Sequence, residues 1–281
     1  MILIADGGST KTEWRVCSAG KKWQSLYTSG INPFFLSGEE IINLLRNELQ
    51  PLAGITFEKI FFYGTGCNSP AKEEIVESAV RKFFSVERIF VGSDLLGAAR
   101  ALCMDEPGIA CIMGTGSNSC YYDGRSILSN VSPLGYILGD EGGAAFIGRK
   151  LLSGVLKKNL PAEVIDRFFN TYNLTSAEIL ENVYMKPFPN RFLGQFSRFI
   201  SSNIEIEELQ DIISSSFEEF IRRNILQYRE ATELQVNFTG SVAYYFSIFL
   251  EAALKANNLK AGIITLSPMD RLAEYHMMNL L

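Results

Sequence analysis

Three short loops, each rich in glycine and hydroxyl side chains, carry the residue types best suited to phosphate chemistry. They span Asp6–Lys11, Gly114–Ser119 and Thr239–Ala243, and each follows an apolar run of strand length. Glycine removes the Cβ that would block a ligand, N–H groups in such turns bind anions, and Asp6 can hold a hydrated metal ion. Taken singly, the first loop also fits an ordinary β-hairpin and the third a Thr or Ser helix cap. Three such loops in one chain predict a phosphate-binding site.

Two acidic segments lie beside glycine at expected strand-to-helix turns. Gly92-Ser93-Asp94 places a carboxylate where a general base would stand, at a strand end, although Asp is also a common helix N-cap. Asp140 and Glu141 lie between Gly139 and Gly142 at an expected helix start. Acidic side chains there interact favourably with the positive end of the helix dipole, and they can also bind sugar hydroxyls or a metal ion. Both readings of each segment stay open at this point.

Charge and rare residue types exclude several functions. A net charge of −5 without a basic run argues against nucleic acid as a partner. A single histidine, His276, leaves almost nothing for a Cys/His zinc site or a Ser-His-Asp triad. The five cysteines contain no CxxC pair, which is typical of reduced intracellular thiols. No secretory signal and no run of about 18 apolar residues occur. We therefore expect a cytoplasmic protein with no membrane association.

The N-terminal part of the chain has the pattern of a mixed α/β domain. Apolar or alternating runs predict strands over 1–5, 13–19, 23–28, 59–63 and 88–91, with a turn at Gly20–Lys22. Helical spacing predicts helices over 37–49, 71–84 and 95–103. Three strands followed by alternating helices and strands predict a mixed sheet covered by helices.

The following segment repeats this opening. Strands are expected over 108–113, 119–122 and 126–131, and aligning Gly8 and Ser9 with Gly116 and Ser117 superposes strand, turn and strand. Such a repeat suggests two similar domains. Further strands are expected over 234–238 and 262–266, and further helices over 144–158, 162–172, 176–184, 191–201, 206–229, 242–257 and 270–281.

The three loops resemble, in order, the phosphate-1, phosphate-2 and adenosine motifs of the sugar kinase/Hsp70/actin superfamily. Within it the chain resembles the BadF/BadG/BcrA/BcrD ATPase group, and most of all N-acetylglucosamine kinases, through Gly30–Asn32, Ser93–Ala98, Gly114–Asn118 and Gly139–Gly142. The resemblance implies an α/β, two-domain actin-like ATPase fold of duplicated ribonuclease H-like domains with an interdomain cleft. The implied domains are 1–107 with the C-terminal helix 268–281, and 108–267 with a helical insertion.

The resemblance also implies ATP and Mg²⁺ as cofactors, and roles at matching positions. Asp94 would be the catalytic base that accepts the proton of the attacking sugar hydroxyl, and Asp6 would organise Mg²⁺ through water. Contacts to the sugar are implied for Asn32, Gly66, Cys67, Asn118 and Asp140. Contacts to the phosphates are implied for Gly8, Ser9, Thr10, Lys11, Gly114, Thr115 and Gly116, and contacts to the adenosine for Gly240 and Ser241.

The implied function is an ATP-dependent amino-sugar kinase that phosphorylates the 6-hydroxyl of N-acetylglucosamine, and we expect a homodimer. Pro33 after Asn32 departs from the family pattern, so glucosamine or a muramic acid derivative stays open as the acceptor. An ATPase that activates a dehydratase is an alternative, in which Cys111 and Cys120 beside the second loop would be candidate ligands of an iron–sulfur cluster. A noncatalytic regulator that binds sugar or ATP is another, although the presence of both Asp6 and Asp94 favours an enzyme.

Overall fold

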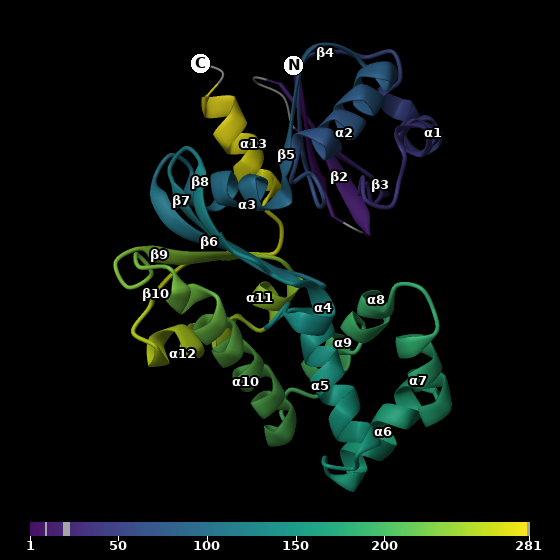
Figure 1. Ribbon diagram of the computed structural model, residues 1–281, viewed down its shortest axis with the longest axis vertical. Helices are drawn as coiled ribbons and strands as arrows, with labels where there is room; N and C mark the ends of the chain where they lie inside the picture. The colour runs from purple at the N-terminus through teal and green to yellow at the C-terminus, as the bar shows by residue number, and fades with distance from the viewer. Residues whose placement is uncertain (9, 19–22, 280–281) are drawn as a thin grey trace. The chain divides into compact units, whose positions relative to one another are not determined.

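The computed structural model describes residues 1–8, 10–18 and 23–279, which divide into two compact units (Figure 1). Unit 1 comprises Met1–Glu106, Gly124–Ser126 and Pro268–Leu281, and unit 2 comprises Pro107–Asp123 and Ile127–Ser267. Each unit is built on one five-stranded sheet. Ser9 and the turn expected at Gly20–Lys22 lie outside the described residues.

The sheet of unit 1 has the strand order β3-β2-β1-β4-β5. Its strands are β1 (Ile2–Gly7), β2 (Lys11–Cys17), β3 (Gln24–Ser29), β4 (Thr56–Gly64) and β5 (Ser85–Ser93). The first three strands form an antiparallel meander, while β1, β4 and β5 run parallel. The sheet is therefore mixed, as the sequence predicts, and the carboxyl ends of three neighbouring strands meet at one edge.

Helices cover both faces of this sheet. Alternate residues of β1 divide between the faces: Leu3 and Ala5 pack with α1 (Gly38–Glu48) and α2 (Pro70–Phe83). Ile2 and Ile4 pack with α3 (Asp94–Cys103) and α13 (Met269–Met278). A short 3₁₀ helix, η1 (Gln50–Leu52), follows α1. An apolar strand buried on both faces explains why the first residues read as one continuous hydrophobic run.

The sheet of unit 2 repeats this topology, with the order β8-β7-β6-β9-β10. Its strands are β6 (Pro107–Met113), β7 (Ser117–Asp123), β8 (Ile127–Val131), β9 (Gln235–Thr239) and β10 (Lys260–Thr265). Strand directions also match those of unit 1, so the duplication expected from the sequence is present. The expected alignment was wrong in detail: Gly8 N donates to Lys11 O and Gly114 N to Gly116 O, so Gly8 corresponds to Gly114.

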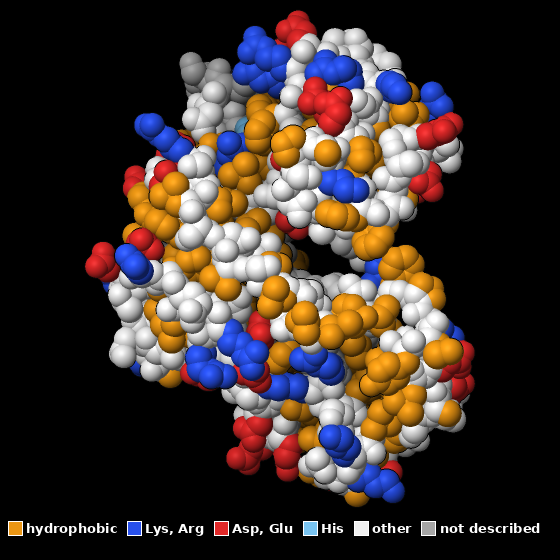
Figure 2. Space-filling view, in the orientation of Figure 1, with side chains coloured by type: hydrophobic (Ala, Val, Ile, Leu, Met, Phe, Trp, Pro, Cys, Tyr) orange, Lys and Arg blue, Asp and Glu red, His pale blue; other side chains and the backbone are white. Residues whose placement is uncertain are grey.

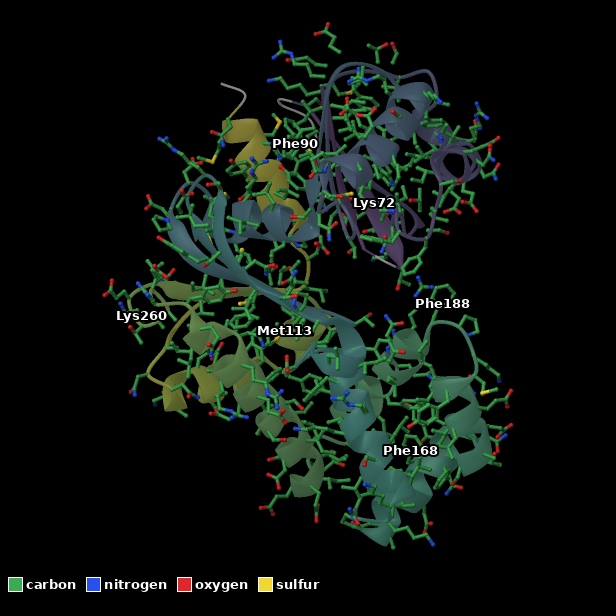
Figure 3. All side chains as sticks on the ribbon, viewed as in Figure 1. Lys72, Phe90, Met113, Phe168, Phe188 and Lys260 are labelled. Carbon is green, nitrogen blue, oxygen red and sulfur yellow. The ribbon has the colours of Figure 1, made fainter. Side chains whose placement is uncertain are left out.

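Most helices of unit 2 lie between β8 and β9 in the chain. They are α4 (Gly135–Leu138), α5 (Ala144–Leu156), α6 (Ala162–Tyr172), α7 (Ser176–Tyr184), α8 (Pro189–Gly194), α9 (Ser197–Ser201), α10 (Glu207–Arg223) and η2 (Ile225–Gln227), with α11 (Ser241–Tyr245) and α12 (Ser247–Ala256) following β9. Phe168 of α6, labelled in Figure 3, packs against Phe196 and Phe199. One hydrophobic core joins these helices to the inner face of the sheet.

Three expected helices are shorter or divided. The helix expected over 206–229 ends at Arg223, with Asn224 as its C-cap, and the Asn224 amide donates to Glu141 at 3.4 Å. The helix expected over 242–257 is interrupted at the buried Phe246, and the one over 191–201 breaks between α8 and α9. Tertiary packing overrides local helical propensity at these positions.

The surface of unit 2 exposes apolar side chains where α7 connects to α8. Figure 2 shows hydrophobic side chains gathered there, and Tyr184, Met185 and Phe188 are all exposed. Within the described part of the chain, no helix is both long and apolar enough to cross a membrane.

Candidate functional site

The carboxyl ends of β1, β4 and β5 bring the acidic residues of unit 1 together. Thr65, directly after β4, donates its N–H to Gly7 O at the end of β1 at 2.8 Å. Its hydroxyl donates at 2.7 Å to Oδ2 of Asp94, the residue directly after β5. Polar groups at the carboxyl ends of parallel strands are the usual location of a ligand site in such sheets. Thr65 was not among the residues selected from the sequence, because its link to Asp94 spans two strands.

Asp94 is not the N-cap of α3. Ser93 is, and its side chain accepts the N–H of Leu96 at 3.2 Å. The carboxylate of Asp94 accepts the N–H of Leu95 through Oδ1 at 2.8 Å and the Thr65 hydroxyl through Oδ2. The interpretation of Asp94 as a simple helix cap is therefore wrong, and these hydrogen bonds hold its carboxylate in one orientation.

Asp6 and Asp94 lie close enough for their charges to interact. Burial, and then the neighbouring carboxylates of Asp94 and Glu13, raise the pKa of Asp6 to about 7. Burial also raises the pKa of Asp94, although the bonds from Thr65 and Leu95 oppose the shift. Two half-buried carboxylates whose charges interact suit a hydrated divalent cation, because Mg²⁺ is typically held by one or two carboxylates plus phosphates. The donor set fits Mg²⁺.

The loops that contain Asn32 and Gly66 contact each other. Gly66 has φ +87°, and a Cβ there would lie 2.4 Å from Asn32 Oδ1, so glycine is required. Asn32 is buried and its Oδ1 accepts the N–H of Phe34 at 2.9 Å. The thiol of Cys67 lies in the hydrophobic core, so Cys67 can reach a ligand only through its backbone.

The first phosphate loop joins β1 to β2. Gly8 N donates to Lys11 O at 2.9 Å, which makes the loop a hairpin turn with Thr10 exposed at its tip. The ammonium group of Lys11 lies 4.6 Å from the ring centroid of Tyr27 on β3, so the structure shows it in a cation–π contact. Its charge also lowers the pKa of Asp6, which places it near that carboxylate. Ser9 lies outside the described residues.

The glycine-rich loop Gly114–Ser119 of unit 2 is hydrogen-bonded to the start of α5. Ala144 N donates to Gly114 O and Ala145 N to Thr115 O, each at 2.9 Å. A Cβ on Gly143 would lie 2.6 Å from the carbonyl carbon of Gly116. Glycine at this position is therefore needed for the close approach that fixes the path of the loop.

Asp140 and Glu141 have different roles although they are adjacent. Asp140, with φ +55°, accepts the N–H of Ser117 at 3.3 Å, and a Cβ on Gly116 would lie 2.6 Å from its Oδ2. Burial raises its pKa to about 6. Glu141 is buried and pairs with Arg223 at 3.3 Å and Asn224 at 3.4 Å. Neither acid lies in the first turn of α5, so the helix-dipole interpretation is wrong. Left-handed backbone at Asp140 is the kind of strain that functional sites retain.

Asn118 follows the second loop on β7. Its Oδ1 accepts the N–H of Ser119 and the amide of Asn130, both at 2.9 Å. These bonds direct the side chain toward β8, whereas Asp140 lies against the loop itself. The structure thus places Asn118, Asp140 and the second loop in unit 2, and Asn32, Gly66, Cys67, Asp6 and Asp94 in unit 1.

The adenosine motif opens onto a cavity of about 410 Å³ in unit 2. Gly240, with φ +119°, packs so closely on β6 that a Cβ would lie 2.3 Å from the carbonyl oxygen of Met113, a residue labelled in Figure 3. The N-cap of α11 is Gly240, which makes no side-chain hydrogen bond. The alternative prediction of a Thr or Ser N-cap in this loop is therefore wrong. The cavity is lined by Ser241, Arg198, Tyr245 and their neighbours. Arg198 was missed from the sequence, because it lies on α9, about forty residues before this motif.

Comparisons with known proteins agree with this architecture. No protein-family model and no curated protein matches the chain. Among solved structures, it is similar to a proposed N-acetylglucosamine kinase from Porphyromonas gingivalis, with 46% identity over 100% of both chains and a TM-score of 0.96. A proposed N-acetylglucosamine kinase from Chromobacterium violaceum shares 14% identity over 98% of each chain, with a TM-score of 0.73. A non-polymerising mutant of MamK bound to AMPPNP shares 11% identity over 99% of this chain and 98% of its own, with a TM-score of 0.52. The last two show the fold alone, which is the actin-like ATPase fold.

Proposed function

We propose that this chain, which belongs to the N-acetylglucosamine kinase-like family of the sugar kinase/Hsp70/actin superfamily, is an ATP-dependent kinase that phosphorylates the 6-hydroxyl of N-acetylglucosamine. The observation that carries the proposal is the Asp94 carboxylate, held by Thr65 and Leu95 at the strand ends beside Asp6. The 46% identity to a proposed N-acetylglucosamine kinase supports the choice of an amino sugar.

In the proposed reaction, Asp94 accepts the proton of the attacking hydroxyl as the oxygen bonds to the γ-phosphorus of ATP. The bond from that phosphorus to the β,γ-bridging oxygen breaks, and ADP leaves. The raised pKa of Asp94 makes it a stronger base than an ordinary aspartate, and the Thr65 hydroxyl fixes which lone pair faces the substrate. Phosphoryl transfer needs little covalent help, so most of the rate enhancement comes from positioning and charge stabilisation. Orientation of one hydroxyl toward Asp94 is therefore the main task of the sugar-binding residues.

Asp6 would hold Mg²⁺ through water, and the ion would neutralise charge on the phosphates of ATP. Backbone N–H groups of the loops at Gly8–Lys11 and Gly114–Gly116 would bind the phosphate oxygens. The cavity beside Gly240 and Ser241 would take the adenosine, since the volume and location suit a nucleoside. MamK, which shares the fold, binds the ATP analogue AMPPNP.

Recognition of the sugar would rest on Asn32 and Asp140, with contributions from Gly66, Cys67 and Asn118. A carboxylate that accepts hydrogen bonds from two neighbouring sugar hydroxyls discriminates strongly between sugars. A sugar that lacks one of these hydroxyls leaves a buried acceptor unpaired. Asp140 suits this role because Glu141, and not Asp140, is engaged by Arg223. We also propose that the protein acts as a homodimer, which sedimentation velocity measures directly.

The dehydratase-activator alternative requires cysteines that can reach a cluster shared between subunits. Cys111 and Cys120 have no exposed surface and lie within strands of unit 2. Buried thiols of this kind behave as small apolar core residues. The kinase is therefore the better-supported function.

A coupled assay of ADP release tests the proposal. The purified chain is given ATP and Mg²⁺ with N-acetylglucosamine, glucosamine, N-acetylmannosamine, N-acetylmuramic acid or glucose, beside a control without sugar. We expect strong stimulation by N-acetylglucosamine, with the phosphate found on oxygen 6 by ³¹P–¹H correlation spectra. ADP release that no sugar stimulates would contradict the kinase and favour an ATPase.

The two adjacent acids provide a matched pair of variants. Asp140→Asn should raise the KM for the sugar by about 10- to 100-fold, because a charged acceptor for two hydroxyls is lost. Glu141→Gln should leave this KM unchanged and lower the free energy of unfolding by about 1 kcal/mol, since it weakens a partly exposed ion pair with Arg223. Steady-state kinetics and urea unfolding of both variants measure these effects. A higher sugar KM in Glu141→Gln than in Asp140→Asn would reverse the assignment.

A further inference from the structure

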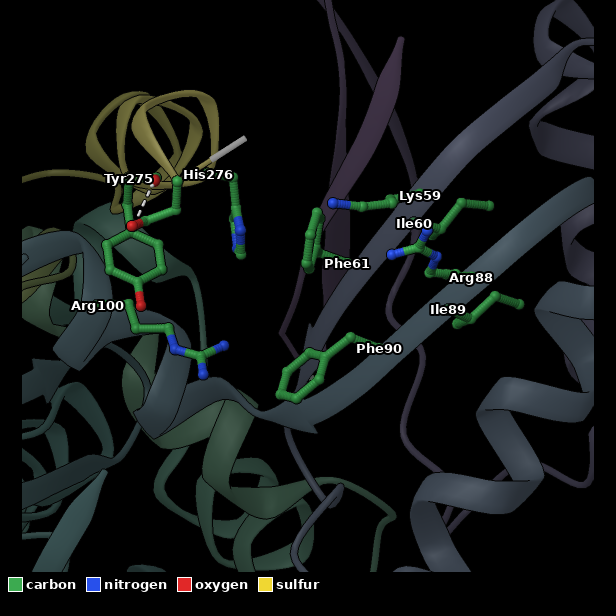
Figure 4. A pocket seen from close by; sticks show the side chains of 10 residues that line it. Lys59, Ile60, Phe61, Arg88, Ile89, Phe90, Arg100, Tyr275 and His276 are labelled. Carbon is green, nitrogen blue, oxygen red and sulfur yellow. Dashed lines mark hydrogen bonds between the residues drawn. The ribbon is translucent and has the colours of Figure 1, made fainter. Parts of the chain in front are cut away.

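A second cavity in unit 1 is lined by none of the residues assigned to the proposed reaction. It has a volume of about 390 Å³ and lies between strands β4 and β5 and helices α3 and α13 (Figure 4). Its charged lining residues are Lys59, Arg88 and Arg100, and Asp and Glu are absent from the described lining. A cavity with three cations and no acid has the electrostatic character of an anion site.

Two of these cations lie directly opposite each other. Lys59 on β4 pairs in register with Arg88 on β5, the edge strand of the sheet. Like charges at opposed positions of neighbouring strands destabilise a sheet. Neither residue forms an ion pair within residues 1–8, 10–18 and 23–279. Two neighbouring cations without an ion-pair partner in the described chain are available to a bound anion.

The next pair on this face of the two strands gives the cavity an aromatic wall. Phe61 and Phe90 are opposed in register, two residues beyond Lys59 and Arg88, so all four side chains lie on one face of the sheet. Phe61 also stacks on the ring of His276 with centroids 3.7 Å apart, and the guanidinium of Arg100 lies 4.9 Å from the centroid of Phe90. Figure 4 shows these rings and the charged groups around one space.

His276 contributes a neutral ring to this wall. Arg100 Nη1 donates to the Tyr63 hydroxyl at 2.6 Å, which leaves the Tyr63 proton for Nε2 of His276 at 2.9 Å. Burial, and then the charges of Arg100 and Lys59, lower the pKa of His276 to about 3. The positive charge of the cavity at neutral pH therefore comes from the lysine and arginine side chains.

We propose that this cavity binds a small phosphomonoester, with its phosphate held by Lys59 and Arg88 and its ring against the aromatic wall. A phosphate dianion matches two adjacent cations, and the guanidinium of Arg88 can bind two of its oxygens. The aromatic wall distinguishes an organic ester from inorganic phosphate, because only an ester has a ring to bury there. A nucleoside monophosphate and a sugar phosphate share this chemistry.

Isothermal titration calorimetry with UMP, N-acetylglucosamine 6-phosphate and inorganic phosphate tests the proposal and separates the two sources. We expect one ester to bind to the wild-type chain at least about 10-fold more tightly than inorganic phosphate. The variant Lys59→Ala/Arg88→Ala should weaken that ester at least about 10-fold. Lys82→Ala, which removes one exposed charge from α2 of the same unit, should change the affinity less than about 2-fold.

Asp140→Asn separates this cavity from the proposed sugar site. It should leave the binding of UMP unchanged, whereas any N-acetylglucosamine 6-phosphate bound at the sugar site should bind more weakly. The proposal is overturned if neither ester binds, if Lys82→Ala weakens binding as much as the double variant, or if Asp140→Asn abolishes it while the double variant does not. Sedimentation velocity completes the test. If the wild-type chain binds neither ester and the double variant changes oligomeric state, this face is an interface between copies of the chain instead.

Discussion

Replacement of Asp94 by Asn should lower kcat at least about 100-fold while ATP still binds with nearly wild-type affinity. Asn keeps the shape of the side chain and can still accept the N–H of Leu95, so the start of α3 should stay folded. It has no basic oxygen to accept a proton, and loss of a general base typically costs about 10² to 10⁴ in rate. Single-turnover kinetics with saturating sugar and ATP, beside calorimetric titration of ATP, measure the two quantities.

Asp105→Asn is the matched control for this variant. Asp105 is an exposed acid just beyond the other end of α3, so its replacement removes the same charge from the same unit. Its kcat should equal that of the wild type. Normal turnover in Asp94→Asn would mean that Asp94 only stabilises the local structure, and the proposed mechanism would fail.

Replacement of Asp6 by Asn should raise the Mg²⁺ concentration needed for half-maximal turnover at least about 10-fold, because a neutral amide holds a hydrated cation weakly. The wild-type enzyme should also need more Mg²⁺ as the pH falls below about 7, the pKa to which burial and Asp94 raise the Asp6 carboxyl. Mg²⁺ titrations of ADP release at several pH values check both statements. A variant with unchanged metal dependence would remove Asp6 from the metal site.

The same variant should be more stable than the wild type at pH 8 without Mg²⁺. The pKa of the Asp6 carboxyl is 3.8 in the unfolded chain and about 7 in the folded chain. The protonated carboxyl therefore contributes stability that is fully present below pH 3.8 and is lost as the pH rises through about 7. Asp6→Asn removes this penalty, by about 1–2 kcal/mol after allowance for partial exposure. Urea unfolding should show that Asp6→Asn increases the free energy of unfolding more at pH 8 than at pH 5. An equal gain at both pH values would contradict the charge-based explanation.

The sequence alone determined the positions of the strands and of the loops that follow them. Apolar runs such as 2–5 and 109–113 are buried on both faces of a sheet, and such strands are recognised from a few consecutive residues. Gly116 and Gly240 mark positions where neighbouring groups approach the backbone closely, and such positions also depend on local residue type. For this reason the duplicated α/β architecture was predictable, and so were the places of Asp6 near the end of a strand, Asp94 at the start of a helix and Asp140 in a loop.

Only the tertiary structure decided which side chains meet. The partner of Asp94 is Thr65, the partner of Glu141 is Arg223, and the cations opposite one another are Lys59 and Arg88. These pairs lie on separate strands and helices, and no local pattern encodes their register. The register also corrected the alignment of the two hairpins, because it is fixed by hydrogen bonds across strands rather than by residue spacing along one of them. Local sequence sets the period of each element, whereas contacts distant in sequence, and the ends of several helices, depend on the packing of the whole unit.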